Sequence, residues 1–334
     1  MGNKEGTSKQ QKKEKVEEKT MNKNLKFVST VNMSHEEWLE RRRGTIGGSD
    51  AAAVVGLNPF SSPYALWAEK TGRVPGFAGN LATEVGTYME EFVAKKFEQE
   101  TGKKVRRCNN IIYNPDYPFA HVNIDRDVIA EDAGLECKTT DSLNLKKFKN
   151  GEYPENYYCQ CVHSMAVTGK QRWYLAVLIG NKEFKWFTLE RDEAEINALM
   201  TAEADFWELV KSDTPPAVDG TRATTETIKT IYSESNEETV DLTFEKSALE
   251  QYMALGKQIS ELEAMRDEAA NKIKSFMGEA GGGFCDRFKV AWKSSARRTF
   301  DTKKFVKDNP DMDLSDYYRT TNTRTFRVTE MKAV

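Results

Sequence analysis

The sequence has little of what secreted, membrane and metal-thiolate proteins depend on. It contains only five cysteines and three histidines among 334 residues. An odd number of cysteines, without an apolar signal segment before them, predicts reduced thiols in a cytoplasmic protein. No apolar run approaches the roughly 20 residues that a membrane-spanning helix needs, so the sequence predicts neither a transmembrane protein nor a membrane partner. Cys159 and Cys161 lack a second pair at zinc-ligand spacing, which argues against a zinc or iron–sulfur site.

The chain also lacks an excess of charge of one sign. Its 49 basic and 52 acidic residues give a net charge of -3, which by itself argues against a nucleic-acid partner. The charges are segregated, however. Residues 1–24 carry seven Lys and four Glu, residues 186–250 carry 16 acidic and five basic residues, and residues 284–334 carry 12 basic and seven acidic residues. The whole-chain sum therefore hides local fields of both signs.

Composition and turn signals divide the chain into three parts. Residues 1–24 are charged and almost free of apolar side chains, which predicts a disordered tail. A core follows over residues 25–215 and ends at Pro215-Pro216, a turn signal typical of a boundary. Residues 220–334 form a C-terminal extension with a basic end and a long helix over residues 249–277, whose apolar stripe suits an oligomer or partner contact. Short strands are expected at residues 288–292 and 323–328.

Periodic patterns predict alternating helices and strands in the core. Apolar residues recur at helical spacing in some segments and alternate with polar residues in others. Ser34, followed by Glu37 at capping-box spacing, begins a helix that the glycine-rich residues 44–50 end. Further helices are expected at residues 51–55, 62–70, 81–101, 154–168 and 192–210, and strands at residues 110–113, 119–129, 135–139, 173–179 and 184–189. The predicted fold class is α/β, a small mixed sheet flanked by helices, with a helical C-terminal extension.

Three carboxylates and a lysine fall where this fold would bring them together. Glu136 and Lys138 are two residues apart, so in a strand they point to the same side, whereas Cys137 points the other way into apolar packing. Residues 119–139 are expected to form a β-hairpin, whose turn would bring Asp125 near Glu136. Glu90, on the preceding long helix, is placed to close the site.

These residues predict metal-dependent chemistry on a phosphodiester. Converging carboxylates repel one another unless a cation neutralises them, and oxygen ligands with open positions favour Mg²⁺ or Mn²⁺. A lysine beside such a cation can orient a water or stabilise developing charge. The simpler alternative for Glu136 and Lys138 alone is a surface ion pair worth under ~1 kcal/mol. Asp125 on the preceding strand and Glu90 on the preceding helix favour the functional interpretation.

Five motifs in order extend this constellation, and together they resemble the YqaJ viral recombinase family, phage-type relatives of lambda exonuclease. The motifs are residues 38–50 (WLERRRGTIGGSD), 86–91 (GTYMEE), 123–125 (NID), 135–138 (LECK) and 157–168 (YYCQCVHSMAVT). The resemblance covers about residues 35–210. It implies a restriction-endonuclease-like core of the PD-(D/E)xK class.

The resemblance also implies roles for individual residues. Glu90, Asp125 and Glu136 would be metal ligands, joined by the main-chain carbonyl of Cys137, and Lys138 would act on the attacking water.

A second set of residues would hold the 5′-phosphate of the cut strand. Arg42, Ser49 and Gln160 match the family positions with this role. An Arg offers a planar fork to phosphate oxygens, and Ser49 lies near an expected helix N-terminus, a natural anion site. Without the resemblance, Ser49 is more simply a helix cap. Asn123 departs from the exonuclease prototype, which has Ser there, and this keeps endonuclease action open.

The function implied is Mg²⁺-dependent 5′-to-3′ exonuclease resection of double-stranded DNA ends, leaving 5′-phosphates and feeding a single-strand annealing protein in recombination. Family relatives form ring trimers, and a phage-encoded member would act in the bacterial host cytoplasm. Two alternatives stay open. One is a structure-specific or site-specific endonuclease on the same core, and the other is a non-catalytic protein that binds DNA or docks a partner.

Overall fold

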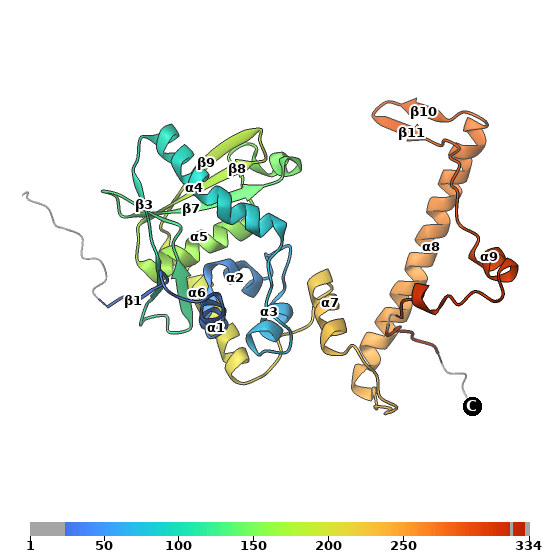
Figure 1. Ribbon diagram of the computed structural model, residues 1–334, viewed down its shortest axis with the longest axis horizontal. Helices are drawn as coiled ribbons and strands as arrows, with labels where there is room; N and C mark the ends of the chain where they lie inside the picture. Colours follow the sequence, from blue (N-terminus) through green and yellow to red (C-terminus); the bar gives the residue numbers. More distant parts are fainter. Residues whose placement is uncertain (1–23, 321–322, 331–334) are drawn as a thin grey trace, which may run out of the picture. The chain divides into compact units, whose positions relative to one another are not determined.

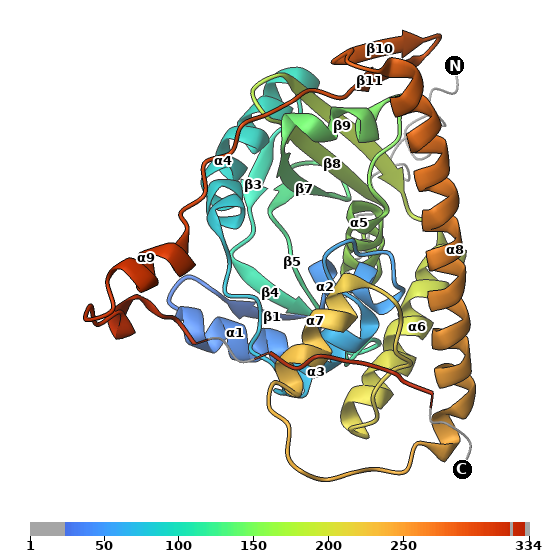
Figure 2. The same cartoon turned by 90° about the vertical axis from the view of Figure 1, so that its right-hand side faces the viewer.

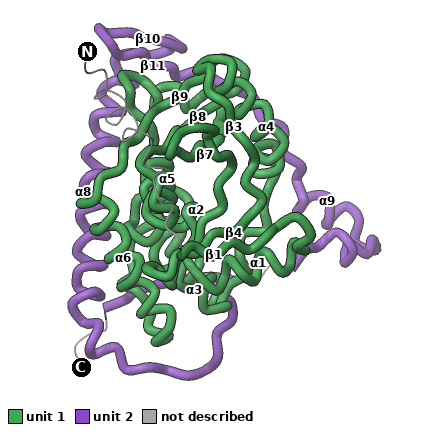
Figure 3. Tube along the Cα trace, turned by 90° about the vertical axis from the view of Figure 1, so that its left-hand side faces the viewer, with its two compact units in different colours: residues 1–231 green, residues 232–334 purple. Residues whose placement is uncertain are grey.

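The computed structural model describes residues 24–320 and 323–330 of the chain. The chain divides into two compact units between Ile231 and Tyr232, and Figure 3 shows them in separate colours. The predicted tail lies outside the described residues, apart from its last position. The first unit runs past the predicted boundary at residue 215 because helix α7 (Arg222–Ile231) packs on helix α3, where Ser62 Oγ and Thr224 Oγ1 are hydrogen-bonded at 2.7 Å.

The helices of the first unit follow the predicted periodic segments closely. Ser34 caps the first of them by accepting a hydrogen bond from Glu37 N, and the αL residue Gly169 ends another, as glycine does readily. The α-helices before α7 are α1 (His35–Arg43), α2 (Gly48–Val54), α3 (Pro63–Lys70), α4 (Leu81–Thr101), α5 (Glu155–Thr168) and α6 (Glu193–Lys211), with a 3₁₀ helix at Ser142–Phe148. Helix α2 begins earlier than predicted, so Ser49 and Asp50 lie in its first turn and neither is its N-cap residue.

The strands of the first unit form two sheets (Figures 1 and 2). The four-stranded sheet has the order β1 (Lys26–Ser29), β4 (Asn110–Tyr113), β5 (Ala120–Asn123) and β2 (Ile46–Gly47). The five-stranded sheet has the order β3 (Val105–Arg107), β6 (Arg126–Val128), β7 (Ala133–Thr140), β8 (Arg172–Ile179) and β9 (Glu183–Glu190). Strands β7 and β8 are parallel and the other neighbours in this sheet are antiparallel, so the predicted mixed sheet with flanking helices is confirmed.

Helices cover both faces of the five-stranded sheet. On one face, Val93 and Phe97 of α4 pack against Leu135 of β7 and Tyr174 of β8. On the other face, α5 and α6 pack against alternate residues of β8, such as Leu175. Because side chains alternate along a strand, the even-numbered residues of β7 point toward α5. Glu136 and Lys138 are therefore on the α5 side, and Cys137 packs with the apolar cluster on the α4 side, as predicted.

The predicted single strand over residues 119–129 is wrong. The chain leaves the four-stranded sheet after Asn123 and enters the five-stranded sheet at Arg126, so two strands take the place of one. The hairpin that the structure contains is β6–β7, in which Arg126 pairs with Leu135 and Asp127 with Gly134. The alternating pattern concealed the change because buried apolar residues recur at Val122, Ile124 and Val128 without a visible break. Asp125 lies in the passage between the two sheets.

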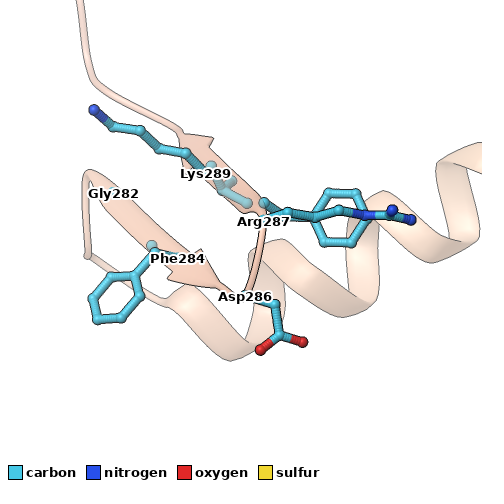
Figure 4. A pocket seen from close by; sticks show the side chains of 8 residues that line it. Gly282, Phe284, Asp286, Arg287 and Lys289 are labelled. Carbon is cyan, nitrogen blue, oxygen red and sulfur yellow. The ribbon is translucent and has the colours of Figure 1, made fainter.

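The second unit is built around one long helix. Helix α8 (Lys246–Met277) leads into a hairpin of β10 (Gly282–Cys285) and β11 (Phe288–Ala291), and a short helix α9 (Thr302–Asp308) follows. Figure 4 shows Phe284, Arg287 and Lys289 projecting from the hairpin. The strand expected at residues 323–328 is absent, and these residues have no regular secondary structure. In the described part of the chain, no helix is long and apolar enough to cross a membrane.

Candidate active site

Asp125 is held by the main chain of the strand that carries the other site residues. Its Oδ2 accepts a hydrogen bond from Cys137 N at 2.8 Å. Burial raises the pKa of the Asp125 carboxyl well above its usual value, and the negative charges of Glu136 and Glu90 raise it further against the opposing effect of Lys138. Asp125 therefore lies beside the segment of β7 that carries Glu136 and Lys138, as the sequence predicted.

Glu136, Lys138 and Gln160 form a closed hydrogen-bonded group. Glu136 Oε1 accepts from Lys138 Nζ at 2.8 Å and from Gln160 Nε2 at 2.6 Å, and Gln160 Oε1 accepts from Lys138 Nζ at 2.8 Å. Burial alone would lower the pKa of Lys138, but the charges of Glu136 and Asp125 outweigh it and raise that pKa above its usual value. The surface ion pair that was the simpler alternative is excluded because Glu136 is buried.

The donor set of this group fits a hard divalent cation. Glu136 Oε2 is buried and has no hydrogen-bond partner, an arrangement that costs free energy unless a ligand satisfies the oxygen. The negative charge of Glu136 raises the pKa of the Asp125 carboxyl, so both carboxylates contribute to one local negative field. Oxygen atoms of this kind are the ligands that Mg²⁺ and Mn²⁺ prefer. Among the described residues, no group of three or more His, Cys, Asp and Glu side chains is arranged to hold a metal ion, so the convergent set is two carboxylates.

Glu90 is the predicted ligand that the structure engages elsewhere. It lies on α4, which covers the opposite face of the sheet, and its carboxylate forms an ion pair with Arg126. The Arg126 side chain is buried, and it also donates to Glu91 Oε2 at 3.0 Å and to the main-chain oxygen of Asp125 at 2.6 Å. Arg126 therefore connects the helix to the strand passage that carries Asp125.

The predicted phosphate-binding residues of α1 and α2 are in direct contact. Arg42 Nη2 donates to Ser49 Oγ at 2.7 Å, and its guanidinium lies 4.6 Å from the ring centroid of Trp38. Beside them, Asp50 Oδ2 accepts from Lys70 Nζ at 2.7 Å. Burial would raise the pKa of Asp50, but the charges of Lys70 and Arg42 overcome this and lower it to about 2. The Arg42 side chain remains partly exposed, which leaves room for an anion to approach.

The two groups of residues meet at Gln160. Helices α2 and α5 pack so closely that a Cβ on Gly48 would lie 3.2 Å from Cγ of Gln160 and 3.4 Å from Oγ of Ser164. A larger residue at position 48 would push Gln160 away from Glu136 and Lys138. Gln160 therefore lies between the start of α2, which carries Ser49, and the carboxylate group on β7.

Comparisons with known proteins identify the family of the chain. Residues 37–171 match the YqaJ-like viral recombinase domain. The uncharacterized protein YqaJ of Bacillus subtilis (strain 168) is 40% identical over 305 residues, which cover 90% of this chain and 95% of that protein. The chain belongs to the YqaJ family. The matched YqaJ domain contains all eight residues that were predicted for the site.

Solved structures similar to this chain include two exonucleases. An alkaline exonuclease from Laribacter hongkongensis is 23% identical, with a TM-score of 0.46 over 54% of this chain and 94% of that one. A phage-related exonuclease from Haemophilus somnus 129PT is 12% identical, with a TM-score of 0.38 over 51% of this chain and 96% of that one.

Sequence reasoning missed the buried charges that support the candidate site. Lys70 donates to Asp50 and to the main-chain oxygens of Arg42 and Thr45, at 2.7 and 2.9 Å respectively for the two oxygens. Arg126 is the second buried cation. Lys70 stands between Glu69 and Thr71 at the end of its helix, so no local pattern marked it as buried.

A buried histidine pair also supports α5 from behind. His163 Nδ1 lies 2.8 Å from Glu203 Oε1 of α6, and His163 Nε2 lies 2.8 Å from the main-chain oxygen of His121. His121 Nδ1 in turn lies 2.8 Å from Thr45 Oγ1. The burial and the contacts of both histidines fit a structural role.

Proposed function

We propose that this protein is a divalent-metal-dependent deoxyribonuclease. The observation that carries the proposal is the convergence of Asp125, Glu136 and Lys138 on one face of the sheet, with Glu136 Oε2 buried and unpartnered. Most buried oxygens in structural groups are satisfied within the protein. The viral recombinase domain to which residues 37–171 are similar supports DNA as the substrate.

Asp125 and Glu136 would hold the cation, with the Cys137 carbonyl as a further oxygen donor, whereas Glu90 stays paired with Arg126. When bound, Mg²⁺ or Mn²⁺ supplies the positive charge that lets the two carboxylates coexist and that stabilises charge developing on the phosphate. Lys138 has three N–H donors, and Glu136 and Gln160 account for two of them. The third orients the attacking water or a phosphate oxygen, so Gln160 acts as a positioning residue for Lys138.

The decisive assay compares linear 5′-phosphorylated duplex with covalently closed circular duplex, with and without Mg²⁺. We expect Asp125→Asn and Lys138→Ala each to reduce cleavage by about 10³-fold, because each removes a group at the reacting centre. Asp125→Asn keeps an acceptor for Cys137 N, so the fold is preserved. Lys147→Ala, an exposed lysine outside the site, is the matched control. Full activity in either site variant would show that the reaction takes place elsewhere.

The polarity of the reaction is the finer part of the proposal. We infer 5′-to-3′ exonuclease action on double-stranded ends, which would leave single strands for an annealing protein, because Arg42 and Ser49 adjoin the carboxylate group. Arg42→Ala should reduce the preference for 5′-phosphorylated over 5′-hydroxyl ends by about tenfold, the loss of one charge-assisted contact. The exposed neighbour Arg43→Ala is its control.

Nicking of the closed circle would favour an endonuclease on the same core. The structure adds one observation on this alternative. The amide of Asn123, which replaces the Ser of the exonuclease prototype, lies 3.5 Å from the main-chain oxygen of Asn110 and so faces the neighbouring strand. DNA binding that needs no metal, with no turnover, would instead support a non-catalytic role.

A further inference from the structure

Helix α8 exposes an apolar stripe along its length. No residue of this 32-residue helix is buried. The large apolar side chains of the stripe are between 48% and 95% exposed; they are Tyr252, Leu255, Ile259, Leu262, Ile273 and Phe276. An isolated helix with its apolar face in water gains little from packing. At the N-terminal end only Tyr252 has an aromatic neighbour, because Phe326 lies against it at 5.4 Å between ring centroids.

The stripe follows a seven-residue repeat. Its positions alternate in steps of three and four residues, which is the a/d pattern of a coiled coil. In order, they are Ala248, Tyr252, Leu255, Ile259, Leu262, Arg266, Ala269, Ile273 and Phe276. A strict 3.5-residue period keeps the stripe facing a partner helix over more than three heptads, whereas packing on a globular surface follows a 3.6-residue period and a broader face.

The outer face of α8 has the opposite character. Three ion pairs join residues four apart on the part of α8 that lies off the stripe: Lys246–Glu250, Lys257–Glu261 and Lys272–Glu268. Such pairs stabilise an exposed helix surface. One side of the helix is therefore suited to water and the other to a second apolar helix.

We propose that two copies of this chain associate through α8 as an antiparallel coiled coil. The stripe is symmetric about residue 264, so an antiparallel partner aligned there pairs the whole stripe. Tyr252 meets Phe276 of the second copy, Leu255 meets Ile273, and Ile259 meets Ala269. Large residues face large ones at the ends, and a large residue faces a small one in the next layer, as interdigitating packing requires.

Arg266 decides the orientation. In a parallel pair, each a-position faces its own copy, so two Arg266 guanidinium groups would be buried against each other and would repel. Ala269 would also face Ala269 and leave a gap in the core. In the antiparallel pair, Arg266 of one copy faces Leu262 of the other. Its long side chain can then extend past the stripe toward Glu263, an acidic residue beside it. The polar a-position therefore selects one register and one direction.

Cysteine cross-linking of the full chain tests both the pairing and its direction. In a Cys285→Ser background, which removes the exposed native thiol, mixing the single variants Ile259→Cys and Ala269→Cys and oxidising should give a disulfide-linked heterodimer. Neither single variant alone should cross-link to itself, and Ser260→Cys on the outer face should not cross-link to any of them. Efficient self-cross-linking of Ile259→Cys would overturn the antiparallel arrangement.

A second measurement guards against a variant that fails to assemble for other reasons. Leu262→Glu places a charge in the stripe, whereas Ser260→Glu places the same charge on the outer face. Light scattering of the full chain should give Leu262→Glu half the mass of Ser260→Glu, and both should retain the DNA-cleaving activity of the first unit. Equal masses, together with no cross-link in the cysteine mixture, would reject self-association and assign the stripe to a different partner. Because neither readout depends on cleavage, the result stands apart from the proposed nuclease function.

Discussion

The two units of this protein bury their apolar residues to very different extents. The first unit packs three clusters of buried side chains around its sheets, including fully buried Trp173, Phe97 and Leu135. The second unit, in its described residues, has no buried hydrophobic side chain. The charges differ in the same way, since the first unit buries Lys70 and Arg126 in ion pairs and the second pairs its charges on a helix surface.

This difference indicates two modes of stabilisation. A unit that removes apolar surface from water within one chain is stabilised by its own core. Its function can therefore depend on a rigid, desolvated site. A unit that presents its apolar residues outward depends on helix propensity and on whatever covers the stripe. Matched substitutions in the two units can separate these modes.

The largest contrast is expected from glycine-to-alanine changes. Gly134 of β7 lies under the buried ring of Trp173, and a Cβ there would come within 2.4 Å of that ring. Gly134→Ala should therefore reduce the free energy of unfolding of the first unit by about 3 kcal/mol, through overpacking. In the hairpin of the second unit, the nearest atom to a Cβ on Gly283 would be 3.9 Å away. Gly283→Ala should therefore leave the free energy of unfolding unchanged.

Tryptophan fluorescence during urea unfolding measures the Gly134 effect, because five of the six tryptophans belong to the first unit. An unchanged midpoint in Gly134→Ala would mean that Trp173 can move aside and that the sheet is less tightly packed than described.

Acid should distinguish the buried ion pair of the first unit from the exposed pairs of the second. The pKa of Asp50 is lowered to about 2 from 3.8, so its contribution is present above pH 4 and is lost as the pH falls toward 2. Asp50→Asn should reduce the free energy of unfolding by about 2 kcal/mol at pH 7, and the gap to the parent should narrow on acidification. Urea unfolding at several pH values measures it.

The control for this experiment is Glu250→Gln, which removes an exposed ion pair of α8. It should produce no measurable change at any pH, because surface pairs contribute little. A gap between the parent and Asp50→Asn that stays constant down to pH 2 would mean that Asp50 stabilises by shape and hydrogen bonding instead of charge.

The smallest effect has the opposite sign. Gly256 lies in the middle of α8, and a Cβ there would meet nothing within 4 Å. Gly256→Ala should stabilise the helix by about 1 kcal/mol, because alanine has the higher helix propensity. The change should appear in hydrogen exchange of α8 amides and not in the tryptophan transition. Slower exchange in the first unit as well would show that the two units unfold together.

Much of the fold could be predicted from local patterns. The cap at Ser34 and the helical periodicity of residues 81–101 and 154–168 predicted helices α1, α4 and α5 correctly, since these signals act over a few residues. The change of sheet after Asn123 could not be predicted, because alternation looks the same in two short strands as in one long strand. Pairing partners in a sheet depend on residues far away in the sequence.

The site shows the same division. The neighbours Glu136 and Lys138 could be placed on one face from their spacing alone, and the structure confirms this. The ion pair between Glu90 and Arg126 could not be foreseen, because it joins a helix to a strand 36 residues later. Gln160 was assigned to phosphate, and the structure places it between Glu136 and Lys138, a contact that depends on how α5 packs over β7.

The passage between the two sheets gives the site a mechanical property. Glu136 and Lys138 share one strand and move together. Asp125 lies in the segment that leads from the four-stranded sheet into the five-stranded sheet. A small shear between the sheets would change the separation of the two carboxylates without disturbing the lysine. The hydrogen bond from Cys137 N to Asp125 Oδ2 links this segment to β7. The spacing on which a cation would depend is thus set by this contact together with the adjacent pairing of Arg126 with Leu135.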